Sequence, residues 1–226
     1  MYIIILAAGI GSRLKNLTKH KPKSLVKFQK KSLFEYQLSV IKSFNFLDLF
    51  LVTGFKKNEF HKYKNYIKGT FHNSDYKKSN MVYSLYNAKS LFNGSNDIII
   101  SYGDIIYEKK VLKKLIMDKN KMSVVIDLNW KKLWSLRMNN PEKDVESLKL
   151  NSKGFITEIG KKVESLKNIE GQFIGLIKIK KEFTKNFFDI LEKKKVSKKI
   201  FMTDYLQLLI KEKKFPKSVK IKNGWL

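Results

Sequence analysis

The sequence contains no cysteine and only three histidines, and arginine occurs only at positions 13 and 137. The absence of cysteine excludes a disulfide framework, a thiolate metal site and a cysteine nucleophile. His20, His61 and His72 lie far apart in the chain, and their spacing fits neither a metal site nor a catalytic triad. We therefore expect the three histidines at the surface or in loops.

Long hydrophobic runs are also absent. The apolar segment 2–8 is too short to span a membrane, and no basic segment precedes it as in a signal peptide. We therefore predict a soluble, cytoplasmic protein with no membrane partner. The 226 residues, of which 43% are hydrophobic and 13% aromatic, suffice for one globular domain, with at most a small appendage.

Acidic residues are few: 20 aspartates and glutamates stand against 47 lysines and arginines, which gives a net charge of +27. This charge raises the hypothesis of a nucleic-acid-binding protein. Proteins that recognise nucleic acids rely on arginine for bidentate contacts, whereas this charge is nearly all lysine, spread along the chain. We therefore expect long-range attraction of anionic substrates and no nucleic-acid partner. A basic nucleic-acid binder remains the alternative of another class.

A glycine-rich segment follows the first apolar run. Residues 2–6 form an apolar run rich in β-branched residues, which predicts a buried strand, and residues 7–13 are Ala-Ala-Gly-Ile-Gly-Ser-Arg. Glycine lets backbone N–H groups approach a ligand closely. Arg13 and Lys23 add positive charge, so the segment predicts a polyphosphate site. The simpler alternative is an ordinary strand-to-helix turn.

Two commoner glycine motifs do not fit this segment. The dinucleotide-binding pattern needs a third glycine where the chain has Leu14. The P-loop pattern needs a lysine directly after its last glycine, whereas the first lysine after Gly11 is Lys15. Both motifs are therefore excluded as the basis of the polyphosphate site.

Apolar periodicity predicts alternating strands and helices. We expect strands at 48–54, 97–104, 122–127 and 171–177, a short strand that opens at 71–72, and a hairpin of 148–150 with 155–159. We expect helices at 32–41, 57–66, 80–91, 111–117, 130–137, 183–191 and 203–210. Ser32 with Glu35 and the pair Thr203-Asp204 are the expected helix caps. This alternation predicts an α/β fold, a three-layer α/β/α open, mostly parallel, Rossmann-like sheet.

The pair Gly103-Asp104 follows the apolar run 98–100. Ligands bind at the carboxyl ends of strands in open parallel sheets, and an aspartate there suits a hard cation. A helix N-cap is the alternative, although Asp104 lies several residues before the expected helix. Further on, Trp130 and Trp134 are four residues apart, which places them on one helix face. Core packing and an acceptor pocket wall both remain open for these tryptophans.

At these residues the chain resembles a known family. The pattern L-A-A-G-x-G-S-R-L at 6–14, followed by K-P-K-S-L-V at 21–26, is similar to the nucleotidyltransferases that make nucleotide-activated sugars and alcohols. The segment N-x-x-Y-S-L at 80–85 resembles the phosphocholine cytidylyltransferase-like branch. Residues 127–130, the Trp134/Arg137 pair and residues 144–146 resemble a subset of that branch. The resemblance covers most of the chain and is strongest before residue 110.

The resemblance implies an enzyme that transfers CMP from CTP to a small phosphorylated metabolite and releases pyrophosphate. It implies Lys23, Arg13 and Asp104 as catalytic residues, with Mg²⁺ as cofactor on Asp104. It implies a nucleotide-binding set of Leu6, Ala7, Ala8, Gly9, Gly11, Ser12, Arg13, Lys23, Asn80, Ser84 and Gly103. It implies an acceptor-binding set of Trp130, Arg137, Glu146, Lys161, Gln172 and Asp204. In one domain spanning 1–226, residues 1–120 would bind the nucleotide and residues 121–226 the acceptor.

The acceptor and the base stay open at this point. The resemblance favours L-glutamine phosphate, which would give CDP-L-glutamine for capsule modification. Phosphocholine, aminoethylphosphonate or a sugar 1-phosphate are alternatives, as is a related enzyme that uses UTP or dTTP. Family members carry a second metal-binding aspartate after a segment like residues 223–226, and this sequence ends at Leu226. We therefore expect either a C-terminal truncation or a ligand from elsewhere.

Overall fold

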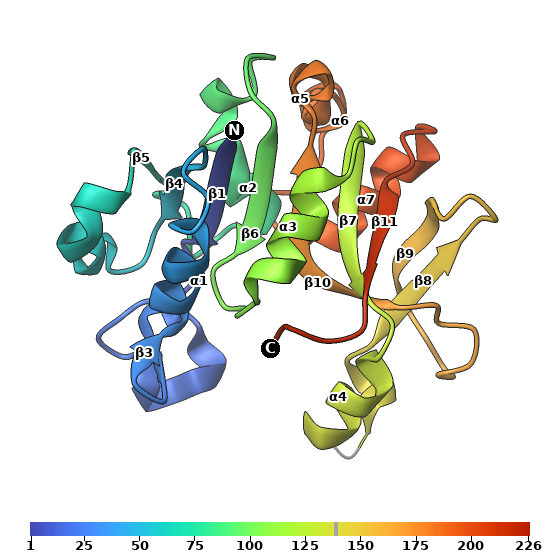
Figure 1. The fold of residues 1–226 in the computed structure, drawn as a ribbon, viewed down its shortest axis with the longest axis horizontal. Helices are drawn as coiled ribbons and strands as arrows, with labels where there is room; N and C mark the ends of the chain where they lie inside the picture. The colour runs from blue at the N-terminus through green and yellow to red at the C-terminus, as the bar shows by residue number, and fades with distance from the viewer. Residues whose placement is uncertain (138–139) are drawn as a thin grey trace.

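The computed structural model describes residues 1–137 and 140–226, and the side chains of Arg137 and Lys143 lie outside the description. Within this part of the chain, one seven-stranded sheet has the order β11-β7-β10-β6-β1-β4-β5 (Figure 1). The strands are β1 (Tyr2–Ala7), β4 (Asp48–Thr53), β5 (Gly69–His72), β6 (Ile98–Tyr102), β7 (Met122–Asp127), β10 (Gln172–Ile179) and β11 (Lys217–Ile221).

Parallel pairing dominates this sheet. The neighbours β6, β1, β4 and β5 run parallel to one another, and β11 runs parallel to β7. Only β10 is antiparallel to its neighbours, β6 and β7. The central strand β1 is buried on both faces, with Ile3, Ile4 and Ile5 fully inaccessible to solvent. A strand covered on both sides needs a continuous apolar run, so the prediction of a buried first strand is confirmed.

Helices cover both faces of the sheet, as Figure 1 shows. One face packs against α1 (Leu33–Ile41), the 3₁₀ segment η3 (Lys57–Tyr66) and α3 (Lys109–Met117). The other face packs against α2 (Met81–Tyr86), α5 (Lys181–Phe187), α6 (Asp189–Lys193) and α7 (Met202–Lys211). The predicted three-layer, mostly parallel α/β fold is therefore confirmed. No helix among the described residues has the length and apolar character that crossing a bilayer requires.

The remaining short helices and strands lie outside the seven-stranded sheet. The predicted hairpin is present as β8 (Glu146–Leu150) and β9 (Ile156–Lys162), and it packs on α7. The helix α4 (Trp130–Arg137) precedes the 3₁₀ turn η5 (Pro141–Lys143). Between β1 and α1 lie the 3₁₀ segments η1 (Ser12–Thr18) and η2 (Lys23–Leu25) and the strands β2 (Lys27–Phe28) and β3 (Lys31–Ser32); η4 (Lys89–Leu91) follows α2.

Several predicted elements differ from the structure. The segment predicted as a helix at 57–66 is a 3₁₀ segment whose buried residues, Phe60 and Tyr63, are three apart, which is the repeat of a 3₁₀ helix. The helix predicted at 183–191 divides into α5 and α6. At this break the adjacent side chains of Phe187 and Phe188 are both buried. The strand predicted to open at 71–72 instead begins at Gly69 and ends there.

One predicted helix cap is wrong and another is confirmed. The helix α7 begins at Met202, one residue before the predicted cap, and Phe201 occupies the cap position. Thr203 therefore lies inside the helix and donates its hydroxyl proton to Glu146 at 3.3 Å. By contrast, Ser32 and Glu35 form the predicted capping box of α1.

Candidate active site

A first pocket lies where the loop after β1 meets the turn after β6. It is lined by Leu6, Ala7, Gly9, Gly11, Lys23, Ser24, Met81, Tyr102, Gly103 and Asp104. Both strands end here, because β1 and β6 are parallel neighbours in register. The sheet therefore brings together the two segments that carry the predicted phosphate and metal residues, although some 90 residues separate them in the sequence.

At two glycines in this pocket, neighbouring atoms leave no room for a Cβ. Gly11 has a φ of +70°, and a Cβ there would lie 2.8 Å from the Cβ of Lys23. A Cβ on Gly103 would lie 2.5 Å from the carbonyl oxygen of Leu6, to which the Gly103 N–H donates at 3.0 Å. Gly9 differs, since a Cβ there meets no atom within 4 Å. Gly9 therefore borders the open space in which a ligand could lie.

Lys23 and Asp104 form an ion pair across the pocket. The Lys23 Nζ lies 2.5 Å from the Asp104 Oδ2, and the side chains are 39% and 35% exposed. Solvent reaches both groups, so the pair contributes little to stability. A bound phosphate would compete with Asp104 for Lys23, and a cation would compete with Lys23 for Asp104.

Three residues of the predicted nucleotide-binding set, Ala8, Ser12 and Arg13, do not line this pocket. Ser12 and Arg13 are exposed on η1 and do not line the pocket. Ala8 is buried, and its carbonyl oxygen accepts from the Phe55 N–H at 3.1 Å. The backbone of Ala8 thereby joins the loop after β1 to the end of β4.

The segment N-x-x-Y-S-L forms the start of α2. Asn80 caps this helix, its Oδ1 accepting from the Met81 N–H at 2.8 Å. Ser84 is buried, and its hydroxyl accepts from the Asn73 side-chain amide at 2.9 Å. From this segment, Met81 is the residue that lines the pocket.

Asp104 is the carboxylate of the first pocket. Among the described residues, no group of three or more His, Cys, Asp or Glu side chains could hold a metal ion. Mg²⁺ is commonly bound by one or two carboxylates together with substrate phosphates. Asp104 therefore fits an ion that arrives with a nucleotide. Nearby, Leu226 and Ile106 exchange backbone hydrogen bonds of 2.8 Å, two residues after Asp104.

A second pocket adjoins the first and shares Met81 and Tyr102 with it. Its lining also includes Trp134, Asp144, Glu146, Ser147, Leu148, Ile159, Gln172, Phe173, Phe201, Met202 and Thr203. Burial raises the pKa of the Tyr102 hydroxyl, and the charges of Asp104 and Glu146 raise this pKa further. The pKa of Tyr102 is therefore affected by one acid from each pocket, Asp104 and Glu146.

Glu146 is the central acid of the second pocket. Burial raises the pKa of its carboxyl, and the negative charges of Asp204 and Asp144 add to this effect, while the hydrogen bond from Thr203 opposes it. Gln172 fixes the backbone here: its Nε2 donates to the Glu146 carbonyl at 2.6 Å, and its Oε1 accepts from the Glu146 N–H at 3.2 Å. The predicted residues Glu146 and Gln172 therefore lie together in the pocket lining.

The two tryptophans of α4 have different environments. Trp130 is 2% exposed and packs in a cluster with Val145 and Ile169, away from the second pocket. Trp134 lines the pocket, and its indole N–H donates to Asp144 at 3.0 Å. Both rings belong to the same buried cluster, and Trp134 also forms part of the pocket wall.

The remaining predicted acceptor residues lie apart from the pocket lining. Lys161 is exposed on β9 and pairs with Glu158. Asp204 is exposed on α7 and acts on Glu146 through its charge. The side chain of Arg137 lies outside the described residues.

Sequence reasoning missed Tyr102, Met81 and Asp144 as pocket residues. The position of Tyr102 depends on Gly175, whose φ is +91° and where a Cβ would lie 2.7 Å from the tyrosine ring. Gly175 lies where the register of β10 against β7 shifts. A glycine inside an apolar run is the signal for such a bulge, and it was available in the sequence.

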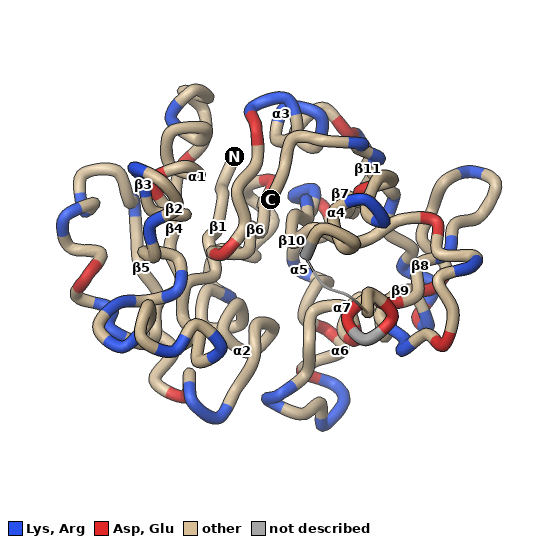
Figure 2. Tube along the Cα trace, turned by 90° about the horizontal axis from the view of Figure 1, so that it is seen from below, with Lys and Arg blue, Asp and Glu red and all other residues tan. Residues whose placement is uncertain are grey.

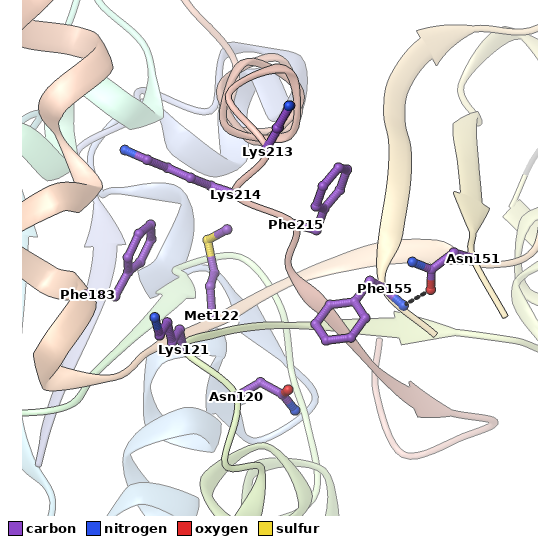
Figure 3. A pocket seen from close by; sticks show the side chains of 9 residues that line it. All are labelled: Asn120, Lys121, Met122, Asn151, Phe155, Phe183, Lys213, Lys214 and Phe215. Atoms are coloured by element: carbon purple, nitrogen blue, oxygen red, sulfur yellow. Dashed lines mark hydrogen bonds between the residues drawn. The ribbon is translucent and has the colours of Figure 1, made fainter. Parts of the chain in front are cut away.

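A wider cavity lies at the opposite end of the strands, away from the first pocket. Figure 3 shows Phe155, Phe183 and Phe215 around it, together with Met122 at the start of β7. Its other lining residues are lysines and asparagines, with no carboxylate among the described lining residues. This cavity opens at the amino end of β7, whereas the glycine loop follows the carboxyl end of β1.

Comparison with known proteins decides the family. Residues 2–133 match the family model described as nucleotidyl transferase. The chain belongs to the nucleotidyl transferase family. It is 38% identical to the CTP:phosphoglutamine cytidylyltransferase of Campylobacter jejuni over an alignment of 241 residues, which covers 100% of this chain and 94% of the relative. It is 39% identical to the choline-phosphate cytidylyltransferase of Streptococcus pneumoniae over 94 residues, 39% of each protein.

Solved structures of other nucleotidyl transferases have the same fold. The inositol-1-phosphate CTP transferase of T. maritima matches with a TM-score of 0.76 and 19% identity, over 99% of this chain and 87% of the other. The CTP:phosphocholine cytidylyltransferase of Streptococcus pneumoniae matches with a TM-score of 0.71 and 19% identity, over 99% of this chain and 91% of the other. The predicted family and fold type are confirmed, and the chain is an enzyme of the nucleotidyl transferase family.

Positive charge is not confined to the site of this nucleotidyl transferase. Figure 2 shows lysine and arginine positions along much of the trace, at both ends of the sheet and on the helices around it. Lys193, Lys194 and Lys195 at the end of α6 are exposed, for example. The charge can therefore attract anions from many directions.

Proposed function

We propose that this nucleotidyl transferase transfers CMP from CTP to a small phosphorylated acceptor that carries a positively charged amine, with L-glutamine phosphate as the first candidate. The observation that carries the proposal is the pair of adjoining pockets. One contains glycines, Lys23 and Asp104. The other contains acids and aromatic rings. The similarity to the Campylobacter jejuni enzyme supports CTP and this acceptor.

The first pocket suits the triphosphate. Backbone N–H groups of residues 8–13 would hold the β- and γ-phosphates, and the exposed Arg13 would turn toward the pyrophosphate as it leaves. Lys23 would contact the α-phosphate and the attacking phosphate, which lowers their mutual repulsion. The base would lie over Ala7, with Met81 at the start of α2 beside it. Asn80 and Ser84 would act through α2, since Asn80 caps this helix and Ser84 is buried against Asn73.

The chemistry requires positioning and charge neutralisation. An oxygen of the acceptor phosphate attacks the α-phosphorus of CTP, and pyrophosphate leaves in line. Because the second pKa of a phosphate group is about 6, the acceptor is largely dianionic at neutral pH and needs no general base. Orientation and electrostatic stabilisation then supply the rate enhancement.

Asp104 would hold magnesium together with phosphate oxygens. The ion would supply positive charge that offsets the charge on the phosphates. Binding of the magnesium nucleotide would replace the ion pair between Lys23 and Asp104 with two new pairs. Lys23 would then contact phosphate, and Asp104 would contact the cation.

The second pocket suits an ammonium group. Glu146 and Asp144 line it, and the charge of Asp204 reaches it. Tyr102, Trp134 and Phe173 supply rings, whose faces attract cations. The lining also supports a division of labour, because residues before 120 line the first pocket and residues after 121 supply most of the second.

A substrate panel tests the proposal. CTP, UTP and dTTP are each incubated with L-glutamine phosphate, phosphocholine, aminoethylphosphonate and glucose 1-phosphate, and pyrophosphate release is followed. We expect turnover with CTP and an amine-bearing acceptor. Preferred turnover of UTP or dTTP with the sugar phosphate would contradict the proposal and support a sugar-nucleotide enzyme. A cytoplasmic location fits the use of CTP.

The net charge of +27 favours one further candidate, a nucleic-acid binder. Such binding would weaken steeply with salt and would not need magnesium. Binding of labelled oligonucleotides at several salt concentrations separates this activity from pyrophosphate release. The candidate leaves the Lys23–Asp104 pocket without a role, so it ranks second.

A further inference from the structure

A buried side chain on α1 bonds both ends of the turn that carries Asp104. Gln37, on α1, is 0% exposed. Its Nε2 donates to the carbonyl oxygens of Tyr102 at 2.9 Å and Ile105 at 2.7 Å, and its Oε1 accepts from the Ser101 hydroxyl at 2.9 Å. Both amide protons and the carbonyl oxygen of Gln37 are therefore used.

The two donated bonds close the turn at both ends. Tyr102 directly precedes Gly103-Asp104, and Ile105 directly follows it. Because a buried carbonyl without a donor is costly, the turn is most stable when both carbonyls reach Gln37. Bulk solvent cannot replace the amide, since the site is sealed under α1.

The same helix is also bonded to the segment that carries Lys23. The Leu33 N–H at the start of α1 donates to the Val26 carbonyl at 3.1 Å, and the Val26 N–H donates to the Lys23 carbonyl at 3.0 Å. The capping box at Ser32 fixes this end of α1. One helix thus connects the backbones on both sides of the Lys23–Asp104 ion pair.

We propose that Gln37 is a positioning residue that sets where Asp104 meets a divalent cation and the phosphates of the nucleotide. Gln37 lines neither pocket and acts through the turn at 102–105. The inference rests on the proposed function, because it takes Asp104 as the ligand of the cation.

A matched pair of variants separates this role from general stability. Gln37→Met keeps similar volume and removes the hydrogen bonds. Lys178→Met is the control, because Lys178 is 2% exposed and also donates to two carbonyls, of Ile116 at 2.6 Å and Asp118 at 2.7 Å. Both variants lose a buried two-carbonyl clamp, and only the first clamp holds the Asp104 turn.

Two measurements are made on the folded variants. Mn²⁺ affinity is measured by electron paramagnetic resonance with the unreactive analogue α,β-methylene-CTP. Outer-shell substitutions typically weaken metal binding by about 10- to 100-fold, and we expect this loss in Gln37→Met and wild-type affinity in Lys178→Met. Without metal or nucleotide, hydrogen exchange of backbone amides at 102–106 should accelerate only in Gln37→Met.

The Asp104→Ala background tests the route of the effect. If Gln37 acts through Asp104, Gln37→Met adds no further loss of Mn²⁺ affinity to Asp104→Ala. Additive losses in the double variant would overturn the inference. Ser101→Ala removes the donor to Gln37 Oε1 and the 3.2 Å contact of the same hydroxyl with the Tyr102 carbonyl, but it keeps both bonds that Gln37 donates. It therefore supplies a milder variant if Gln37→Met does not fold, and we expect a smaller loss in the same direction.

The outcomes distinguish the inference from the proposed function. Wild-type Mn²⁺ affinity in both Gln37→Met and Ser101→Ala, with a clear loss in Asp104→Ala, would overturn the positioning role alone. Wild-type affinity in Asp104→Ala would overturn the metal assignment, and the positioning role would fall with it.

Discussion

The two adjoining pockets are built in different ways. According to the proposed function, the first pocket is the nucleotide pocket and the second is the acceptor pocket. The nucleotide pocket is centred on a glycine loop after β1 and a Gly-Asp turn after β6, which the parallel strand ends bring together. The acceptor pocket is mainly side chains, contributed by α4, β8, β10, α7 and the turn at 144. The first pocket is thus formed largely by short contiguous motifs, whereas the second depends on how distant elements pack. If the proposed roles hold, the residues for phosphate binding are easier to find in a sequence than those for acceptor choice.

Removing the charge of the nucleotide pocket should have the largest effect. Lys23→Ala removes the only charge that contacts both reacting phosphates in the proposed reaction. We expect kcat to fall by about 10²- to 10³-fold, as for loss of one transition-state donor, with the melting temperature nearly unchanged because the Lys23 side chain is 39% exposed. Pyrophosphate release and thermal unfolding measure the two effects.

Lys27→Ala is the control for this variant, since Lys27 is an exposed lysine four residues further on. It should keep wild-type kcat. Near-normal kcat in Lys23→Ala, or an equal fall in both variants, would contradict the assignment of Lys23.

Two glycine variants sharpen the contrast within the nucleotide pocket. Gly11→Ala forces a side chain into left-handed backbone and against Lys23, so we expect a loss of stability of about 1–2 kcal/mol and lower kcat. Gly9→Ala places a methyl group in open space, so stability should be unchanged while the KM for CTP rises. Thermal unfolding and CTP titration test both. An unchanged KM in Gly9→Ala would mean that the triphosphate does not approach this backbone.

Glu146→Gln probes the acceptor pocket and should make the fold more stable while it weakens acceptor binding. The raised pKa of Glu146 means that its ionised form is penalised in the folded protein, so neutralisation should raise the melting temperature at pH 7. The KM for an amine-bearing acceptor should rise by about 10-fold, while the KM for CTP stays constant. The loss corresponds to about 1.4 kcal/mol of binding.

Glu158→Gln is the matched control on the neighbouring strand. The hydrogen bond from Lys161 lowers the pKa of Glu158, so its ionised form is favoured in the folded protein. Neutralising it should lower the melting temperature slightly and leave both KM values unchanged. If Glu146→Gln also lowered the melting temperature, ionised Glu146 would stabilise the fold, and the prediction would be contradicted.

Acidification should weaken acceptor binding through protonation of Glu146. As pH falls through the raised pKa of Glu146, the carboxylate gains a proton and the KM for the acceptor rises, beginning at higher pH than for an ordinary glutamate. The acceptor phosphate titrates near pH ~6 as well. Comparing the pH profiles of wild type and Glu146→Gln isolates this carboxyl, because the variant lacks its titration and keeps that of the phosphate. Superimposable profiles would exclude a role for its charge.

Prediction from sequence worked where neighbours in the chain determine the structure. The apolar run of β1 and the pair Gly103-Asp104 were sufficient to predict a pocket at the strand ends. Spacing alone placed Trp130 and Trp134 on one helix face. Only the tertiary structure shows that Trp134, which donates to Asp144, is the ring that lines the acceptor pocket.

Other features needed tertiary structure. Gln37 looks like any polar residue in an amphipathic helix, and only the fold shows that its amide meets the Asp104 turn. Strand β11 was missed because lysines interrupt its apolar residues, although Val219 and Ile221 are buried. The position of Tyr102 likewise depends on the bulge at Gly175, which places two strands against each other.

A crystal structure with α,β-methylene-CTP and magnesium tests the central claim most directly. The account predicts the triphosphate against backbone N–H groups of residues 8–13, with the Lys23 ammonium moved from Asp104 to phosphate and Asp104 facing the metal. A triphosphate bound elsewhere, or Lys23 still paired with Asp104 beside a bound nucleotide, would contradict it.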